Sequence, residues 1–210
     1  PICGYTVDSG NGTFASWLDW RDAKVVRNLT RLDLDGLALT SPAGHQARVA
    51  SLHALGDMNK TAQGLRVRWG ADDGGALVLD VRNGADGHAD EALIAARDLQ
   101  LGALAPWAAL KPELSPGMAQ WLGTGKPRGK LGQVALRWTR ADGLASANVG
   151  FSGLGVDAVG KLPGIDRLDG VLRGDAGALS VELPPQATVL RFPRTFRKPF
   201  ALSRLAGDIA

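Results

Sequence analysis

The chain has 210 residues, 45% of them hydrophobic and 21% charged, and its 24 basic residues outnumber its 21 acidic residues by only three. This composition excludes intrinsic disorder and predicts one or two domains with a substantial core. No apolar run approaches the roughly 18 residues that a membrane-spanning segment needs. The six tryptophans do not interleave with a basic stripe, as they would in a single-strand nucleic-acid-binding protein.

The two ends of the sequence suggest a segment of a longer protein. Pro1 stands where an initiator methionine would be, and Ile209 and Ala210 fall inside an alternating strand pattern. The sequence carries no signal peptide, and we expect any membrane anchor to lie outside this segment. Cys3 is the only cysteine, so it forms no internal disulfide and leaves the redox compartment open.

The first half of the chain predicts a series of strands. Residues 1–24 fit either a strand edge or a short helix. From Val25 onward, apolar and polar residues alternate with the period of two that is typical of strands with one apolar face. Gly36 interrupts this alternation within what we interpret as a hairpin. Further strands are expected at 47–55, 65–69, 77–81 and 90–101, separated by turns at 41–44, 57–63 and 71–75. In the strand at 90–101 the shared apolar phase consists of Leu93, Ala95, Leu99 and Leu101, with Arg97 as its exception.

The periodicity changes between Gly102 and Leu122, where the apolar spacing and two Pro-containing breaks predict short helices. After this helical insert, alternation resumes from Pro127 to Leu183, with hairpin turns at 140–143 and 174–177. We therefore predict an all-β fold, mostly antiparallel, whose twisted and curved sheet forms a β-groove or a taco-like sandwich. The chain would be one β-rich segment of a longer repeat protein, with possible sub-units 1–101 and 127–210 joined by the insert at 102–126.

Basic residues gather near the C-terminus. They are Arg191, Arg194, Arg197, Lys198 and Arg204. Two interpretations are open, a solvated strand face and a patch for an anionic partner, and we favour the strand face.

Residue patterns that would support catalysis, metal binding or a cofactor are missing from the sequence. His45, His53 and His88 do not stand at metal-ligand spacing, and Asp33 and Asp35 fit a solvated strand face. The glycine-rich stretch at 123–130 has the wrong spacing for a phosphate-binding loop. The stretch at 150–154 lacks the second glycine of a nucleophile elbow. We therefore expect a protein that is not an enzyme and has no metal site and no cofactor.

The order of several short motifs resembles the central region of the YhdP family of AsmA-like proteins. The motifs are Trp-Leu-x-Trp-Arg-Asp at 17–22, Ala-Arg-Asp-Leu at 96–99, Pro-x-Gly-x-Leu at 127–131, Phe-Ser-Gly-Leu at 151–154, Leu-Pro-Gly-Ile at 162–165 and Leu-x-x-Leu-x-Gly-x-Ile at 202–209. This series covers most of the chain, although each motif is short.

The resemblance implies a periplasmic segment of an inner-membrane-anchored protein that carries phospholipid between the inner and outer membranes of a Gram-negative bacterium. Its expected partners are phospholipid acyl chains and neighbouring repeats of the same full-length chain, with membrane contact only through parts outside this segment and no nucleic acid. A second class of function is an envelope-assembly scaffold that pairs its edge strands with client proteins.

A lipid-carrying sheet needs a continuous apolar lining, because each acyl CH₂ exposed to water costs about 0.8 kcal/mol. The expected lining follows the alternating phase within each strand. Its members are Leu77, Leu79, Val81, Leu136, Trp138, Val149, Phe151, Leu179, Val181 and Leu183. A closed β-sandwich would show the same alternation, so the sequence pattern leaves both an open groove and a closed core possible.

Overall fold

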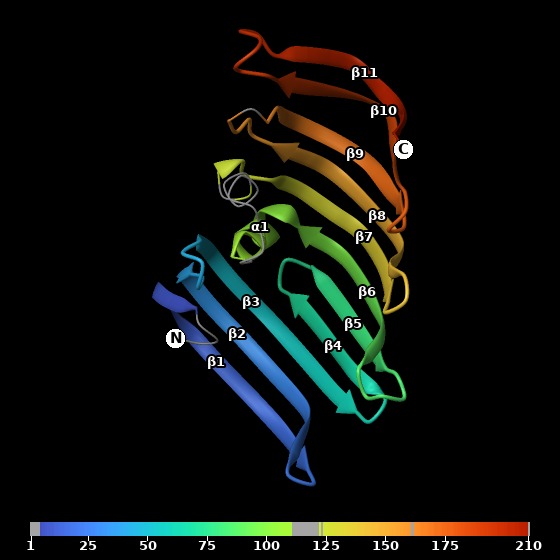
Figure 1. The fold of residues 1–210 in the computed structure, drawn as a ribbon. Helices are drawn as coiled ribbons and strands as arrows, with labels where there is room; N and C mark the ends of the chain where they lie inside the picture. Colours follow the sequence, from blue (N-terminus) through green and yellow to red (C-terminus); the bar gives the residue numbers. More distant parts are fainter. Residues whose placement is uncertain (1–4, 111–121, 123, 161, 210) are drawn as a thin grey trace.

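A computed structural model describes residues 5–110, 122, 124–160 and 162–209. The described residues form eleven strands and one short helix, and the strands make a single antiparallel sheet in which each strand pairs with the next along the chain. Figure 1 shows this sheet as a curved and twisted layer that runs from β1 to β11. The predicted all-β, antiparallel fold class is confirmed.

The elements of the first half are β1 (Thr6–Arg21), β2 (Lys24–Thr40), β3 (Gln46–Thr61), β4 (Gly64–Ala71), β5 (Ala76–Asn83), β6 (Ala89–Gln100) and α1 (Leu101–Ala109). Those of the second half are β7 (Arg128–Thr139), β8 (Gly143–Val156), β9 (Gly164–Gly174), β10 (Leu179–Arg191) and β11 (Phe200–Ile209). The sheet continues without a break from β6 to β7 across the helical insert. Helix α1 falls in the predicted insert, and the rest of that prediction lies largely outside the described residues.

Three boundaries in the first half differ from the sequence-based expectation. Within the ambiguous segment 1–24, Thr6–Arg21 forms strand β1, which pairs along its length with β2. The predicted hairpin around Gly36 is wrong, because β2 is one continuous strand with an irregularity at that glycine. The predicted turn at 57–63 is too long, since Asp57 to Thr61 pair with β4 and extend β3. Asp57 and Asn59 lie on the water-exposed side of the strand, and polar residues of this kind are also typical of turns.

Gly36 marks a switch in the phase of the strand. It has a φ of 60°, a conformation that glycine adopts without strain. Opposite this point in β3, Ala50 and Ser51 are both exposed, and the buried positions change from even numbers, as at Ala54, to odd numbers, as at Val49. Each strand thus carries one extra residue at the same level. The paired irregularities keep the apolar side chains on one face along these long strands.

Helix α1 fills a gap above a short hairpin. Strands β4 and β5 have eight residues each, and β4 pairs only with the Ala54–Thr61 part of β3. The upper end of β3 therefore has no β4 partner, and α1 lies there in contact with β3, β6 and β7 (Figure 1). Val49, Leu99 and Ala105 are buried at this end of the sheet.

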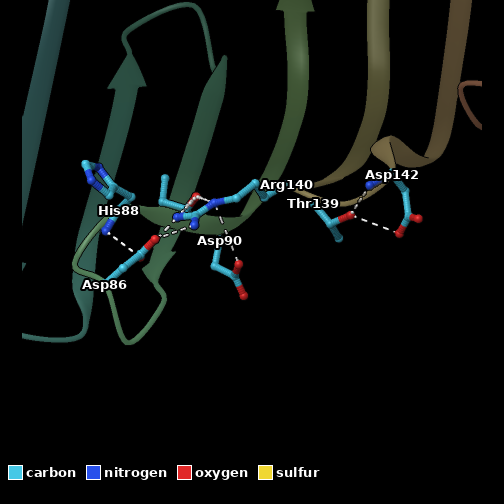
Figure 2. Close-up of polar contacts among 7 residues, drawn as sticks. Asp86, His88, Asp90, Thr139, Arg140 and Asp142 are labelled. Carbon is cyan, nitrogen blue, oxygen red and sulfur yellow. Dashed lines mark hydrogen bonds and ion pairs between the residues drawn. The ribbon is translucent and has the colours of Figure 1, made fainter.

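Ion pairs connect the loops at the opposite end of the sheet. Figure 2 shows Arg140, just after β7, reaching the loop between β5 and β6. Its Nη1 lies 2.6 Å from Asp86 Oδ2, and its Nη2 donates to the carbonyl oxygen of Ala89 at 2.9 Å. The hydrogen bond from Arg140 lowers the pKa of Asp86 below its usual value. Since Arg140 holds two neighbouring loops, it fixes the geometry of this end of the sheet.

The backbones of β4 and β5 lie very close together at Gly64. Gly64 has a φ of +153°, and a Cβ at this residue would stand 1.9 Å from the carbonyl oxygen of Val81. We expect Gly64→Ala to lower the free energy of unfolding by about 2 kcal/mol or more, because neither backbone has room to move without breaking pairing. Gly70→Ala in the same strand is the matched control, as a Cβ there meets nothing within 4 Å. Equal urea midpoints for the two variants would contradict this account.

Candidate functional site

One face of the sheet is apolar across most of its width, and we call it the apolar face. Residues directly opposite each other in antiparallel strands point to the same side, so the register identifies its members. One row runs through Val67, Leu79, Ile94, Leu136, Ala147, Gly174 and Leu179. The next row runs through Trp69, Leu77, Ala96, Val134, Val149, Leu172 and Val181. These rows place apolar side chains side by side from β4 to β10.

The register brings all ten predicted lining residues to this face. Leu77, Leu79, Leu136, Val149, Leu179 and Val181 are in the two rows above, and Val81 shares a third row with Trp138 through Ala92. Phe151 lies opposite Gly170, and Leu183 packs against that glycine, since a Cβ on Gly170 would be 3.0 Å from Leu183 Cδ2. That these residues contact lipid stays a prediction.

The apolar phase predicted for β6 is wrong in part. Ala92, Ile94 and Ala96 share the apolar face, whereas Leu93 and Ala95 lie on the other side. Asp98 has a φ of 57° and switches the phase, so that only the predicted Leu99 reaches the apolar face, opposite Leu131. Ile94 was therefore missed. The sequence does contain a signal for Ile94, because Ala92 and Ala96 stand two positions before and after it in the same alternating phase. The signal is weak because alanine is small and only slightly hydrophobic.

The apolar face is not sealed as a core would be. The accessible surface of the chain is 13348 Å², whereas a compact globular protein of this mass would expose about 9,300 Å². Within the described residues, no large side chain is more than 98% buried. Exposure is graded along the face, from 9% at Leu183 to 39% at Trp138 and 47% at Leu179. The side chains pack against their neighbours in the sheet and leave their outer surfaces open.

The opposite side, which we call the polar face, carries ion pairs between adjacent strands. The pairs include Arg66–Asp80, Arg82–Glu91, Arg137–Glu91, Arg173–Glu182 and Arg27–Asp57. Cross-strand pairs of opposite charge favour one register and suit a water-exposed surface. The sheet therefore separates a wet side from an apolar side.

Glu91 joins three strands on the polar face. It accepts hydrogen bonds from Arg137 Nε at 2.7 Å and from Arg82 Nη1 at 3.2 Å. The hydrogen bond from Arg137 is the main cause that lowers the pKa of Glu91 below its ordinary value. A carboxylate with a lowered folded-state pKa stabilises the fold above its unfolded pKa of about 4.3 and loses this contribution as the pH falls through the folded-state value.

We therefore expect the stability of the protein to fall as the pH is lowered below about 4. In Glu91→Gln this acid-induced loss should be smaller, because the glutamine does not titrate. The measurement is urea unfolding at pH 7 and at pH 3 for both proteins. An equal loss of unfolding free energy in the two proteins would show that Glu91 does not contribute to the destabilisation at low pH.

Three of the polar candidates for a metal site, Asp33, Asp35 and His53, lie close together on β2 and β3. Asp33 accepts a hydrogen bond from Arg31 at 2.8 Å and lies 3.3 Å from His53 Nδ1, and these contacts lower its pKa. Asp35 lies 3.9 Å from His53 Nε2. His88 donates its backbone N–H to Asp86, and His45 follows the turn after β2. Across the described parts of the chain, no group of three or more His, Cys, Asp or Glu side chains is placed to hold a metal ion.

Comparison with known proteins identifies one family. The protein family described as YhdP protein matches residues 5–210. No curated protein and no solved structure matches the chain. Helix α1 is too short to cross a membrane, and no other helix in the described ranges is long and apolar enough to do so.

Proposed function

Since the chain belongs to the YhdP family, a family of the Gram-negative cell envelope, we propose that it is a periplasmic segment of a bridge-like protein. In this proposal phospholipid moves between the inner and outer membranes along the apolar face, and the anchor in the inner membrane belongs to a segment outside this sequence. The chain acts by binding and guiding lipid, without catalysis and without a cofactor.

The observation that carries the proposal is the open, continuous apolar face. Exposing a phospholipid acyl chain of about 16 carbons to water costs more than about 10 kcal/mol of free energy. Half-exposed Leu, Val, Phe and Trp side chains remove this penalty at each position along the sheet, while a polar headgroup stays in water. Rows of similar apolar residues also favour sliding, because neighbouring positions bind an acyl chain with nearly equal free energy.

An envelope-assembly scaffold is the second candidate function, and strand β1 favours it. In the part of the chain that the structure describes, β1 pairs on one side only. Phe14, Trp17 and Trp20 on this edge strand are 66%, 55% and 63% exposed. An edge strand with exposed aromatic residues can pair with a strand of another protein or of a neighbouring repeat. Phospholipid in organic extracts of the native protein, detected by mass spectrometry, supports transport over scaffolding.

Neighbouring residues on opposite faces provide a sharper test. A photo-crosslinking amino acid at Leu79, Leu136 or Val181 is expected to capture phospholipid in cells. The same amino acid at Val78, Ala135 or Ser180, one residue away on the polar face, is the matched control and should capture little. Equal capture at both sets would mean that lipid contact is non-specific, and protein adducts without lipid at the first set would favour the scaffold.

A further inference from the structure

The turn between β10 and β11 combines exposed aromatic rings with unpaired positive charges. We call Phe192, Arg194, Phe196, Arg197, Lys198 and Phe200 the aromatic–basic tip. Phe196 and Phe200 have ring centroids 4.6 Å apart in an edge-to-face arrangement, and Phe192 lies 6.2 Å and 6.1 Å from them. Two backbone hydrogen bonds to the carbonyl oxygen of Phe192, from Thr195 and Phe196, close the turn.

The rings of this cluster are not buried by their contacts with one another. Phe196 remains 47% exposed and Phe200 40% exposed. Phe200 lies opposite Leu190, which lies opposite Ile165, so the cluster extends an apolar row beyond the end of β9 and β10. The tip stands at the end of the β10–β11 hairpin (Figure 1).

The positive net charge of the protein comes from this region. Residues 183–207 contain five basic residues and no acidic residue. The rest of the chain then has 19 basic and 21 acidic residues, a net charge of −2, against +3 for the whole. The charge of the hairpin is therefore concentrated in a protein that is otherwise slightly acidic.

The expectation of a solvated strand face for these basic residues is wrong for three of the five. Arg194, Arg197 and Lys198 lie in the turn after β10, outside any strand. Arg191 differs from them, because it pairs with Asp166 on β9. Within the described ranges, no ion pair joins Arg194, Arg197 or Lys198 to an acidic side chain, although the rest of the sheet pairs many of its charges. Their charge is available to a partner.

We propose that the aromatic–basic tip docks on the surface of an anionic phospholipid bilayer. Aromatic rings favour the boundary between headgroups and acyl chains, and cations beside them gain from the negative surface potential. An acidic protein surface would satisfy the three charges but would leave the two half-exposed rings in water. The bilayer interface satisfies both, and it needs no shaped pocket. This inference concerns a surface outside the apolar face and does not depend on lipid transport. It departs from the expectation that membrane contact occurs only through parts outside this segment, because the aromatic–basic tip belongs to the segment itself.

The test uses a reporter at the tip itself, so that a membrane anchor elsewhere does not affect the result. Thr195 is exposed in the middle of the turn, and Thr195→Cys in a Cys3→Ser background accepts one environment-sensitive nitrobenzoxadiazole dye. The protein is titrated with phosphatidylcholine vesicles in which about one lipid in three is phosphatidylglycerol. A blue shift and an increase in fluorescence are expected on these vesicles, and a much weaker response on pure phosphatidylcholine.

Charge-reversal variants measure how much the basic residues of the tip contribute to vesicle binding. Each basic residue near an anionic surface favours binding roughly fivefold, so R194E/R197E/K198E should lower the vesicle partition coefficient at least about 100-fold. The matched control R21E/K24E/K60E changes the net charge equally at the opposite end of the sheet and should lower it less than about threefold. Phe196→Ser should weaken binding with all three cations in place.

Several outcomes would overturn the proposal. These are an unchanged dye spectrum on anionic vesicles, equal binding by the triple tip variant, and an equal loss in the control variant. A response to monomeric dihexanoyl-phosphatidylglycerol as strong as the response to vesicles would also overturn it, by indicating a site for a single headgroup. Circular dichroism of each variant verifies that the sheet remains folded, and Phe196→Ser provides an independent measurement should the charge reversals disturb it.

Discussion

Replacing Leu136 by Asp is expected to stop lipid transfer while the sheet remains folded. Leu136 is half-buried on the apolar face, between Ile94 of β6 and Ala147 of β8. A carboxylate at this position keeps contact with water because the face is open. An acyl chain that passes over it must remove that water, and an added barrier of about 3 kcal/mol lowers a rate about 100-fold. The measurement is transfer of a fluorescent phospholipid between vesicles by protein long enough to be active, alongside thermal unfolding.

Ala135→Asp is the matched control for this experiment. Ala135 precedes Leu136 in the same strand, is exposed, and lies on the polar face opposite Ala95 and Asn148. The control adds the same charge at nearly the same place and should leave both folding and transfer unchanged. Normal transfer by Leu136→Asp would contradict the proposed path. Unfolding of Leu136→Asp with a stable control would show that the apolar face is closed as a core is.

Local sequence patterns predict much of this fold because strands and turns depend on neighbouring residues. The alternation in β7 and β10 identifies their apolar faces, since Leu136 and Val181 stand in phase with residues two positions away. The turns at 140–143 and 174–177 are visible from their Gly and Asp residues. The order of the short motifs indicates the YhdP family, and the match over residues 5–210 confirms this family.

Phase switches were not predictable from alternation alone. Asp98 takes a positive φ in β6, and nothing in the residues around it requires an irregularity at that position. The reason for the switch is visible only in the pairing with β7, where it brings Leu99 opposite Leu131 on the apolar face. A single phase throughout the strand would place Leu93 on the apolar face, whereas it lies opposite Asp80 and Arg137 on the polar face. Pairing between strands that are distant in sequence supplies this information.

The choice between an open groove and a closed sandwich also depends on non-local structure. Both folds place Leu136 and Leu179 on an apolar face, and they differ only in whether a second layer covers it. The strands form one open sheet in the order β1 to β11, and the exposed hydrophobic residues of this sheet are consistent with a groove. The aromatic–basic tip is a similar case, because its basic residues are expected on a strand face and lie in a turn in the structure.

Leu183→Asp is expected to unfold the protein, whereas Leu179→Asp in the same strand and on the same face is expected to be tolerated. Leu183 is only 9% exposed, since it packs over Gly170 and lies opposite Gly207 in β11. Leu179 is 47% exposed and lies opposite Gly174 near the end of the sheet.

A buried unpaired carboxylate costs several kcal/mol, which is a large share of a total stability of about 5–15 kcal/mol. The glycines beside Leu183 offer the carboxylate no side-chain partner, so this penalty remains uncompensated, while an Asp at position 179 stays hydrated. Thermal unfolding of the two variants measures the difference directly. Loss of folding in both variants would mean that the whole apolar face is shielded from water. The apolar face would then be a closed core. Folding of both variants would mean that water reaches the position of Leu183 as well.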